Sequence, residues 1–417
     1  MPTKEELTAY ARLVVRVGVN LQKDQILVIN TPIDCAPFAR LLAEEAYRAG
    51  AHEVVMSWSD ELSAHLKYVL APDVVFTEFP AWRHAFYTDY AEQGAAFVSI
   101  AARDPEIFRD IDPARLTRAQ QAAGAALLEY RARLMSNQNT WCVVSVPTAA
   151  WAKKVFPKAA SAAEAEQLLW AAILKTVRVT EGRSAEDVVA AWEAHIDFLH
   201  RAAAFLNEND FASLRYENAR GTDFSVKLPV GHLWAGGSEK AATGVYFAAN
   251  LPTEEVYTLP DREGAEGTVY ASKPLVYQGS LIEDFSLRFS GGRVVEFHAE
   301  KGEDKLRELL STDEGANHLG EVALVPYDSP ISRSGILFYN TLFDENAACH
   351  LALGKAYPTC LRGGEEMESV ELLKHGVNDS LLHEDFMVGT ADLAITGTRR
   401  IDGKKIPIFR QGNFACL

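Results

Sequence analysis

In the first half of the chain, short apolar runs alternate with longer stretches whose apolar residues recur at helical spacing. The strand-like runs are Gln25–Asn30, Glu53–Trp58, Ala95–Ile100 and Trp141–Val146, and the helical stretches include Ala36–Arg48 and Arg115–Met135. This alternation predicts an α/β domain in which helices cover a mainly parallel sheet. No glycine-rich phosphate loop follows any of these runs, so the pattern does not indicate a nucleotide site.

The pattern changes near the middle of the chain. Ser184 with Asp187 is typical of a helix start, and His195 is interpreted as a packed residue of the long helix that follows. Beyond Asn207, Gly, Asp and Pro break the sequence into short β-rich runs: Phe224–Leu228, Thr268–Ala271, Arg293–Ala299 and Val322–Val325. We therefore predict an N-terminal α/β domain over residues 1–205 and a strand-rich, mixed α+β domain over residues 206–417.

Composition places the chain among ordinary globular proteins. Its 417 residues are 48% hydrophobic and 24% charged, which is enough for two domains with separate cores. No stretch reaches the ~18 apolar residues of a membrane span. The N-terminus is charged from Lys4 and lacks the apolar region of a signal peptide. We expect a cytoplasmic protein that does not enter a membrane.

The five cysteines are scattered, and none forms a CxxC pair. This spacing argues against a disulfide framework and against a cysteine zinc site. The net charge of −16 argues against a nucleic-acid partner, because such binding needs basic side chains. The acidic excess is larger after residue 200, and two interpretations are open. Either the surface is acidic for solubility, which charge alone favours, or carboxylates gather around cations or a cationic substrate.

Several common catalytic motifs are absent, and isolated acids remain. Without HExxH, GxSxG or a Walker loop, thermolysin-like, α/β-hydrolase and P-loop functions lose support. Glu254 and Glu255 fall in a predicted strand, where neighbours face opposite ways, so only one can enter a site. The alternative is a pair of edge-strand charges that deter aggregation. Glu321 opens the predicted strand Val322–Val325, either at a site or as an exposed terminal acid.

Histidines supply the remaining candidates. Asp344, Glu345 and His350 lie among apolar and small residues, and buried charges must be paired or bound to metal. A lone buried histidine is more often a satisfied core residue. His383 and Asp385 are two apart in a predicted strand and so project from one face. Imidazole with carboxylate suits Zn²⁺, Co²⁺ or Mn²⁺, although so short a pattern gains weight only in combination.

Four segments, in order, carry a resemblance to a known family. PTEEVYT, LGEVALVP, LFDENAACHLALGKAY and NDSLLHEDFMVG resemble the M29 metallopeptidases, the thermophilic aminopeptidase family of aminopeptidase T and PepS. The likeness extends through WCVVSVPTAAWAKKVFP and covers essentially the whole chain. It implies a cytoplasmic metalloaminopeptidase that removes N-terminal residues from small peptides with two divalent metal ions (Zn, Co, Mn or Mg). It also implies a homodimer whose active sites open into an enclosed chamber.

The resemblance also implies roles for single residues. Matched position by position, the implied metal ligands are Glu255, Glu321, Glu345, His350, His383 and Asp385. Tyr357 matches the catalytic tyrosine, which would donate a hydrogen bond to the oxyanion. We expect Glu321 to bridge the two cations, and a carboxylate of the cluster, with Glu321 the first choice, to act as general base. One cation would add Glu255 and His350, with Glu345, and the other His383 and Asp385.

Two other functions stay open. One is a different two-metal hydrolase, an amidase or a phosphoesterase. Phosphate chemistry usually adds basic side chains near the metals, and Lys355 is the only basic residue in the four segments. The other is a non-catalytic metal- or peptide-binding protein, which need not keep Tyr357 together with every ligand.

Overall fold

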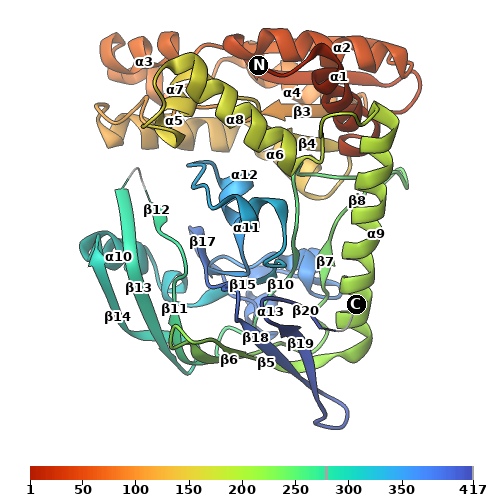
Figure 1. Cartoon of the computed structure of the whole chain (residues 1–417). Coiled ribbons are helices and arrows are strands. Elements are labelled where there is room, and N and C mark those ends of the chain that lie inside the picture. Colours follow the sequence, from red (N-terminus) through yellow and green to blue (C-terminus); the bar gives the residue numbers. More distant parts are fainter. Residues whose placement is uncertain (278–279, 416–417) are drawn as a thin grey trace. The chain divides into compact units, whose positions relative to one another are not determined.

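The computed structural model describes residues 1–277 and 280–415, and these form two compact units (Figure 1). Unit 1 comprises Met1–His195, Ser238–Pro252 and Leu337–Leu342, and unit 2 comprises Ile196–Gly237, Thr253–Ile336 and Phe343–Leu417. The domain boundary predicted at residue 205 stays a prediction.

Unit 1 contains a four-stranded parallel sheet with the strand order β2-β1-β3-β4. Its strands are β1 (Ile26–Pro32), β2 (Glu53–Ser59), β3 (Ala96–Ile100) and β4 (Trp141–Val144), with the short pair β8 (Glu239–Lys240) and β9 (Tyr246–Phe247). Its helices are α1 (Lys4–Leu13), α2 (Ala36–Arg48), α3 (Glu61–Leu70), α4 (Ala81–Glu92), α5 (Pro113–Ala126), α6 (Leu128–Met135), α7 (Ala149–Val155) and α8 (Ala162–Thr176). The predicted parallel sheet is therefore confirmed.

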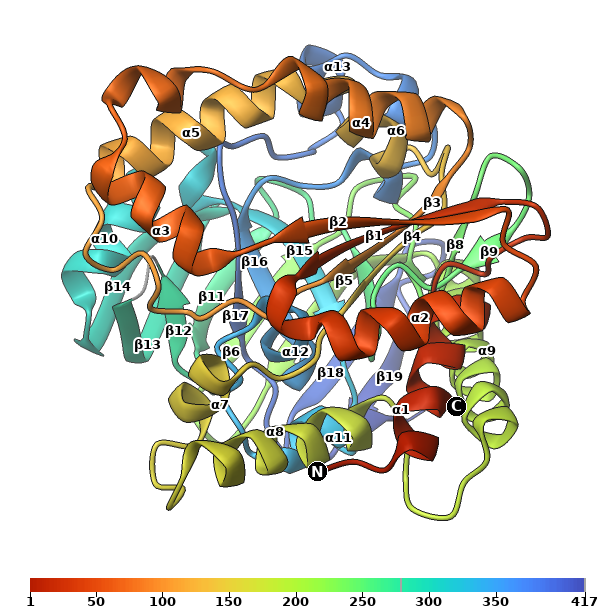
Figure 2. The ribbon, with the colours of Figure 1, turned by 90° about the horizontal axis from the view of Figure 1, so that it is seen from above.

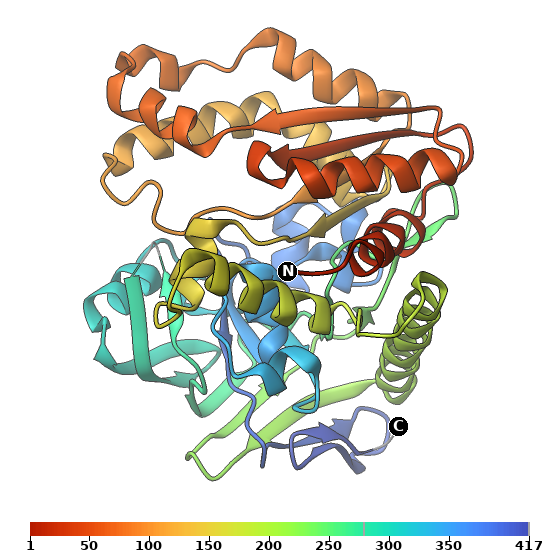
Figure 3. The same ribbon diagram turned by 45° about the horizontal axis from the view of Figure 1, so that its top comes forward.

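Helices cover both faces of this sheet (Figures 2 and 3). On one face, Val28 and Phe97 form a buried cluster with aromatic residues of α4 and α6. On the other face, α2 contacts β1 and β2 and buries its own apolar side. Because both faces are buried, the central strands β1 and β3 are mainly apolar, which agrees with the apolar runs in the sequence.

The predicted helix Arg115–Met135 is wrong in one respect. The structure has two helices there, and Leu127 between them leaves the helical region with φ −101° and ψ 18°. Gly124, three residues earlier, has the poorest helix propensity of any residue except proline, which favours a break at this point. The predicted start at Ser184 is confirmed as a capping box. The Ser184 N–H donates to Asp187 Oδ2 at 3.0 Å, and the Asp187 N–H donates to Ser184 Oγ at 3.2 Å.

The long helix α9 (Ala185–Asn209) leads from the residues of unit 1 into those of unit 2. His195 lies within it and contacts Trp192, with 5.4 Å between the ring centroids. Among the described residues, no helix combines the length and the apolar character needed to cross a membrane.

Unit 2 contains two antiparallel sheets. The first has the order β17-β16-β15-β10-β7, and the second has the order β12-β13-β11-β6-β5-β18-β19-β20, with β14 paired to β13. The first sheet consists of β7 (Ala235–Gly236), β10 (Val256–Thr258), β15 (Leu319–Leu324), β16 (His350–Gly354) and β17 (His383–Met387). The second consists of β5 (Phe211–Glu217), β6 (Asp223–Lys227), β11 (Ala265–Tyr270), β12 (Leu275–Tyr277), β13 (Ser280–Ser290), β14 (Arg293–Lys301), β18 (Ala394–Arg399), β19 (Lys405–Arg410) and β20 (Asn413–Phe414).

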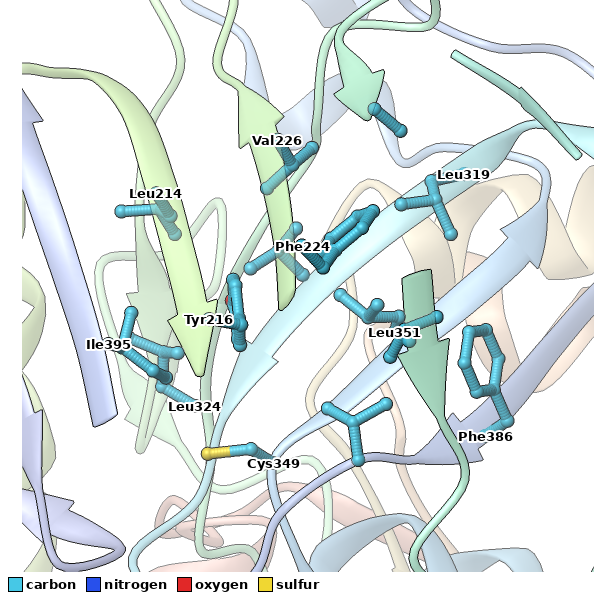
Figure 4. Packing of buried hydrophobic residues seen from close by; sticks show 14 of the residues in the cluster. Leu214, Tyr216, Phe224, Val226, Leu319, Leu324, Cys349, Leu351, Phe386 and Ile395 are labelled. Atoms are coloured by element: carbon cyan, nitrogen blue, oxygen red, sulfur yellow. The ribbon is translucent and has the colours of Figure 1, made fainter. Parts of the chain in front are cut away.

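Short helices complete the unit: α10 (Glu303–Leu310), α11 (Pro330–Ser334) and α13 (Ser369–Lys374). In α12 (Thr341–Asp344), the first two residues belong to unit 1 and the last two to unit 2. The core of unit 2 lies between its sheets. Figure 4 shows Tyr216 and Phe224 of the second sheet packed with Leu324, Leu351 and Phe386 of the first. The predicted strand-rich second half is therefore confirmed.

Four cysteines, Cys35, Cys142, Cys349 and Cys360, are buried free thiols, and Cys416 lies outside the described residues.

Candidate metal centre

One face of the five-stranded sheet carries five of the six predicted ligands, all except Glu345. Glu321 on β15 pairs with Ala352 on β16, and Ala352 pairs with Asp385 on β17. Side chains two residues apart on a strand share a face. His350 lies two residues from Ala352, and His383 lies two residues from Asp385, so both histidines project from this same face.

Glu255 reaches the same face from the edge of β10. It lies two residues before Tyr257, which pairs with Ala323 of β15, and Ala323 lies two residues from Glu321. Ala323 and Ala352 have small side chains, which leaves room for the longer polar side chains around them.

The opposite face of the same strands belongs to the core of unit 2. Val322, Leu324, Leu351, Leu353 and Phe386 alternate with the ligand positions and are buried in the main hydrophobic cluster. A slip of one residue in any strand would move its ligand into the core and its apolar side chains into the site. Hydrophobic packing therefore fixes which residues form the centre.

The candidate ligand atoms lie close together. The Nε2 atom of His350 is 3.3 Å from Glu255 Oε2, 3.3 Å from Glu321 Oε1 and 3.9 Å from Asp385 Oδ1. The Nε2 atom of His383 is 3.5 Å from Asp385 Oδ1 and 3.8 Å from Glu321 Oε2. Two sets suited to an ion result: Glu255, Glu321 and His350 form one, and Glu321, His383 and Asp385 form the other. Glu321 belongs to both sets.

Both imidazoles are oriented by backbone carbonyls. The Nδ1–H of His350 donates to the carbonyl of Ala348 at 3.1 Å, and the Nδ1–H of His383 donates to the carbonyl of Lys355 at 2.6 Å. A carbonyl only accepts, so a proton is assigned to Nδ1, and Nε2 is the nitrogen that faces the carboxylates. Histidines that bind metals are ordinarily held in this way.

Burial and repulsion raise the pKa of two carboxyl groups. Burial raises the pKa of Glu255 to about 7, with repulsion from Glu321 and Asp385 opposed by His350. Burial, with Glu255 and Asp385, raises the pKa of Glu345 well above its ordinary range. The positive charge around these two carboxyl groups is too small to balance the negative charge of the cluster.

The imidazoles respond in the opposite direction. Burial alone would lower the pKa of His350, but the hydrogen bond and charge of Glu321, together with Asp385 and Glu255, raise it to about 10. Asp385 and Glu321 overcome burial to raise the pKa of His383 to about 9. Without another cation, protons on the histidines compensate the carboxylates.

The residues present fit divalent cations. The donor set of imidazole nitrogen and carboxylate oxygen suits Zn²⁺, Co²⁺ or Mn²⁺. Asp385 Oδ1 is buried, and the nearest imidazole nitrogens, Nε2 of His383 at 3.5 Å and Nε2 of His350 at 3.9 Å, lie too far away for a well-formed hydrogen bond. A buried carboxylate oxygen of this kind needs a cation or a donor. The carboxylates of the cluster also outnumber the positive charges around them, and this excess likewise favours a bound cation.

Two predicted residues lie beside these sets. Glu345 belongs to neither, although its pKa responds to their charges, and Asn346 donates to its Oε1 at 3.4 Å. Tyr357 follows β16 and places its ring centroid 4.9 Å from that of His383. Partial burial and then the cluster carboxylates, Glu321 foremost, raise the pKa of Tyr357 above its ordinary value, so its hydroxyl keeps its proton.

The structure corrects two local predictions. Glu321 does not open its strand but lies inside β15, because Gly320 continues the strand as a bulge. A Cβ at Gly320 would lie 2.4 Å from the carbonyl oxygens of Gly354 and Lys355, so the close approach of the strands requires glycine here. Glu254 and Glu255 precede β10 instead of lying within it, and β10 pairs on both sides, so the edge-strand interpretation is wrong.

Other residues hold the segments around the candidate centre in place, but the sequence analysis did not single them out. Asn378 is buried and donates to the carbonyls of Gly354 at 2.6 Å and Gly315 at 2.9 Å. Asp313 accepts from the Leu381 N–H at 2.6 Å and from Ser380 Oγ at 2.8 Å, which fixes the segment before His383. Asn378 stands within a motif that carried the family resemblance, but Asp313 lies outside all four motifs.

Comparison with known proteins places this geometry in a family. Residues 3–414 match the family described as thermophilic metalloprotease (M29). The chain belongs to this family. It is 48% identical to Aminopeptidase 2 of Geobacillus stearothermophilus and 49% identical to Aminopeptidase AmpS of Bacillus subtilis, in each case over 99% of this chain and 98% of the relative.

A solved structure agrees with the fold. The structure of wild-type AmpT from Thermus thermophilus superimposes with a TM-score of 0.90 at 40% identity, and the match covers 99% of each chain. The predicted M29 membership and the α/β fold class are thereby confirmed. Membership in M29 makes the protein a metal-dependent hydrolase of peptide bonds, as predicted.

Proposed function

We propose that this metal-dependent aminopeptidase removes the N-terminal residue of small peptides with two divalent cations, and that it acts as a homodimer in the cytoplasm. The observation that carries the two-cation proposal is the pair of ligand sets that share Glu321. The family and the names of the relatives support the peptidase activity. In this proposal residues 206–417 form the catalytic domain.

Each residue then has a task. Glu255 and His350, with Glu345 beside them, hold one cation, and His383 and Asp385 hold the other, while Glu321 joins both sets. When bound, such a pair of cations polarises the scissile carbonyl and makes water nucleophilic near neutral pH. The two bound cations would be Zn²⁺, Co²⁺, Mn²⁺ or Mg²⁺.

The remaining steps belong to the protein's own groups. Glu321 takes the proton from water as general base and passes it toward the leaving amine. The protonated phenol of Tyr357 donates a hydrogen bond to the oxyanion. The surplus of carboxylates attracts the positively charged α-amine and orients the peptide N-terminus toward the cleavage position.

Metal stoichiometry and substrate class test this proposal together. After chelation, the protein is reconstituted with each cation and assayed on Leu-p-nitroanilide and on p-nitrophenyl phosphate, while bound metal is counted by elemental analysis. We expect two metals per chain and turnover of the anilide alone. Glu321→Ala should lose activity by orders of magnitude together with bound metal. Full activity in that variant would disprove the bridging role.

The alternatives give different results. Turnover of the phosphate ester would identify a phosphoesterase. Two bound metals without hydrolysis of any peptide would identify a binding protein. Sedimentation of the active protein as a monomer would disprove the homodimer.

A further inference from the structure

Lys273 lies at a bend attached to the strand that carries two of the candidate ligands. The preceding residue, Ser272, donates its N–H to the carbonyl of Met387 at 2.7 Å. Met387 ends β17 and pairs with His350 of β16. The next strand, β12, also contacts β17, and Figure 1 shows the two close together. The bend therefore borders the metal-centre sheet.

The charge of Lys273 is not matched by a direct partner. Its side chain is half-buried, and among residues 1–277 and 280–415 it forms neither a hydrogen bond nor an ion pair within 4 Å. Burial lowers its pKa, and only the charge of Asp344 opposes this effect. For comparison, Lys301 lies 3.1 Å from Glu283 and Lys355 lies 3.4 Å from Asp379.

A second polar group beside Lys273 also lacks a partner. The Oγ atom of Ser272 is buried and makes no hydrogen bond with any described residue. A desolvated ammonium and a buried hydroxyl each cost free energy unless they bind something. Both are donors without an acceptor among the described residues, and an anion can reach the half-buried ammonium of Lys273.

The position relative to the cluster suggests which anion. Asp344, which acts on Lys273, precedes Glu345, whose pKa responds to the carboxylates of the centre. A short peptide is a dipolar substrate, with an ammonium at one end and a carboxylate at the other. The acidic centre suits the ammonium, and the unpaired lysine at its border suits the carboxylate.

We propose that Lys273 binds the C-terminal carboxylate of a short peptide and so selects substrates by length. This inference rests on the proposed aminopeptidase function. Lys273 is a specificity residue in this role and takes no part in bond cleavage. Peptides whose carboxylate reaches the ammonium gain affinity, and longer or blocked peptides do not.

A comparison of matched substrates tests the proposal. Leu-Gly, Leu-Gly-Gly and Leu-Gly-Gly-Gly are assayed as free acids and as C-terminal amides, alongside Leu-p-nitroanilide. A charge-assisted contact predicts that the wild type prefers the acid over the amide by roughly 10- to 100-fold in KM at one length. Lys273→Met should raise KM for that acid to the value of the amide. It should leave the amide and the anilide unchanged.

Two further variants separate charge from structure. Lys273→Arg keeps the charge and should restore most of the preference, whereas Lys301→Met, an exposed lysine on β14, should change nothing. Equal kcat losses on acid and amide in Lys273→Met would overturn the proposal. So would a wild type with no preference at any length, while its hydrolysis of the anilide still upheld the peptidase function. Failure to cleave any substrate would overturn both.

Discussion

Tyr357 shows how a single hydroxyl can be tested apart from the ligands around it. Its ring lies against His383, but the side chain remains 41% exposed, which leaves the phenol open to a substrate. Tyr357→Phe keeps the ring contact and removes only the donor. We expect kcat to fall about 10²- to 10³-fold while the bound metal is retained, as elemental analysis would show. Tyr270→Phe, on a similarly exposed tyrosine of β11, should keep full activity. Loss of metal from Tyr357→Phe would contradict the assignment.

Two buried tyrosines should respond to the same substitution with opposite signs. The hydroxyl of Tyr216 lies in the core of unit 2 and has no hydrogen-bond partner among the described residues (Figure 4). Tyr216→Phe should therefore stabilise the protein by about 1 kcal/mol. The Tyr10 hydroxyl donates to the Ser145 carbonyl at 3.1 Å, so Tyr10→Phe should destabilise by about 1 kcal/mol. Urea unfolding measures both, and a destabilised Tyr216→Phe would contradict the packing described.

Among the elements, β15 depends on a bulge that only glycine permits. A Cβ at residue 320 would meet two backbone carbonyls, one of which orients His383. Gly320→Ala should cost about 1–3 kcal/mol of stability and should weaken metal binding, because Glu321 and the Lys355 carbonyl must move. In helix α5, a Cβ at Gly124 meets only Arg131 Nη1, at 3.7 Å. Gly124→Ala should stabilise by about 0.5–1 kcal/mol. Thermal melts measure the two stability changes, and metal titration measures the affinity. An unchanged metal affinity in Gly320→Ala would show that the bulge does not position the ligands.

Local sequence patterns predict a helix or strand well where one type of interaction determines it. The bounds of α2 and the capping box at Ser184 follow from spacing and from side-chain hydrogen bonds. The shared face of His383 and Asp385 follows from strand geometry alone. The apolar run Val322–Val325 predicts a strand that Glu321 opens, whereas β15 begins at Leu319, and only the close approach of β16 explains the glycine at position 320. Long-range contact overrides local propensity there.

At the scale of the whole molecule, sequence patterns could not show which segments of the chain belong to which unit. Segments 238–252 and 337–342 belong to unit 1 although they follow long stretches of unit 2. The second of them contributes Asn340, which donates to the carbonyl of Ala101 at 3.2 Å near the carboxyl end of β3. Hydrophobic periodicity reports one face of one element, and it carries no information about such distant partners. This limit did not affect the prediction of the candidate centre, because all its residues lie in unit 2.

Acid should destabilise unit 2 through two buried histidines. Burial lowers the pKa of His232, against the carbonyl of Pro229 and the charge of Asp210, with the charge of Arg400 reinforcing it. Burial also lowers the pKa of His318, against the hydrogen bond to the Arg262 carbonyl and with the charges of Arg262 and Arg293 reinforcing it. A lowered folded-state pKa means that the unfolded chain binds protons first. Stability is therefore lost as pH falls below about 6.5, by at most about 1.4 kcal/mol per pH unit for each histidine.

The double variant His232→Asn, His318→Asn removes both titrating rings and keeps an amide donor near the position of each Nδ1–H. In the wild type these groups donate to the carbonyls of Pro229 at 2.9 Å and Arg262 at 3.0 Å. Urea unfolding of both proteins from pH 7.5 to 5 should give a flatter decline in the variant. The difference between the two curves isolates the histidines, because the metal-centre groups titrate equally in both proteins. Parallel curves would show that these two buried rings do not make the fold sensitive to acid.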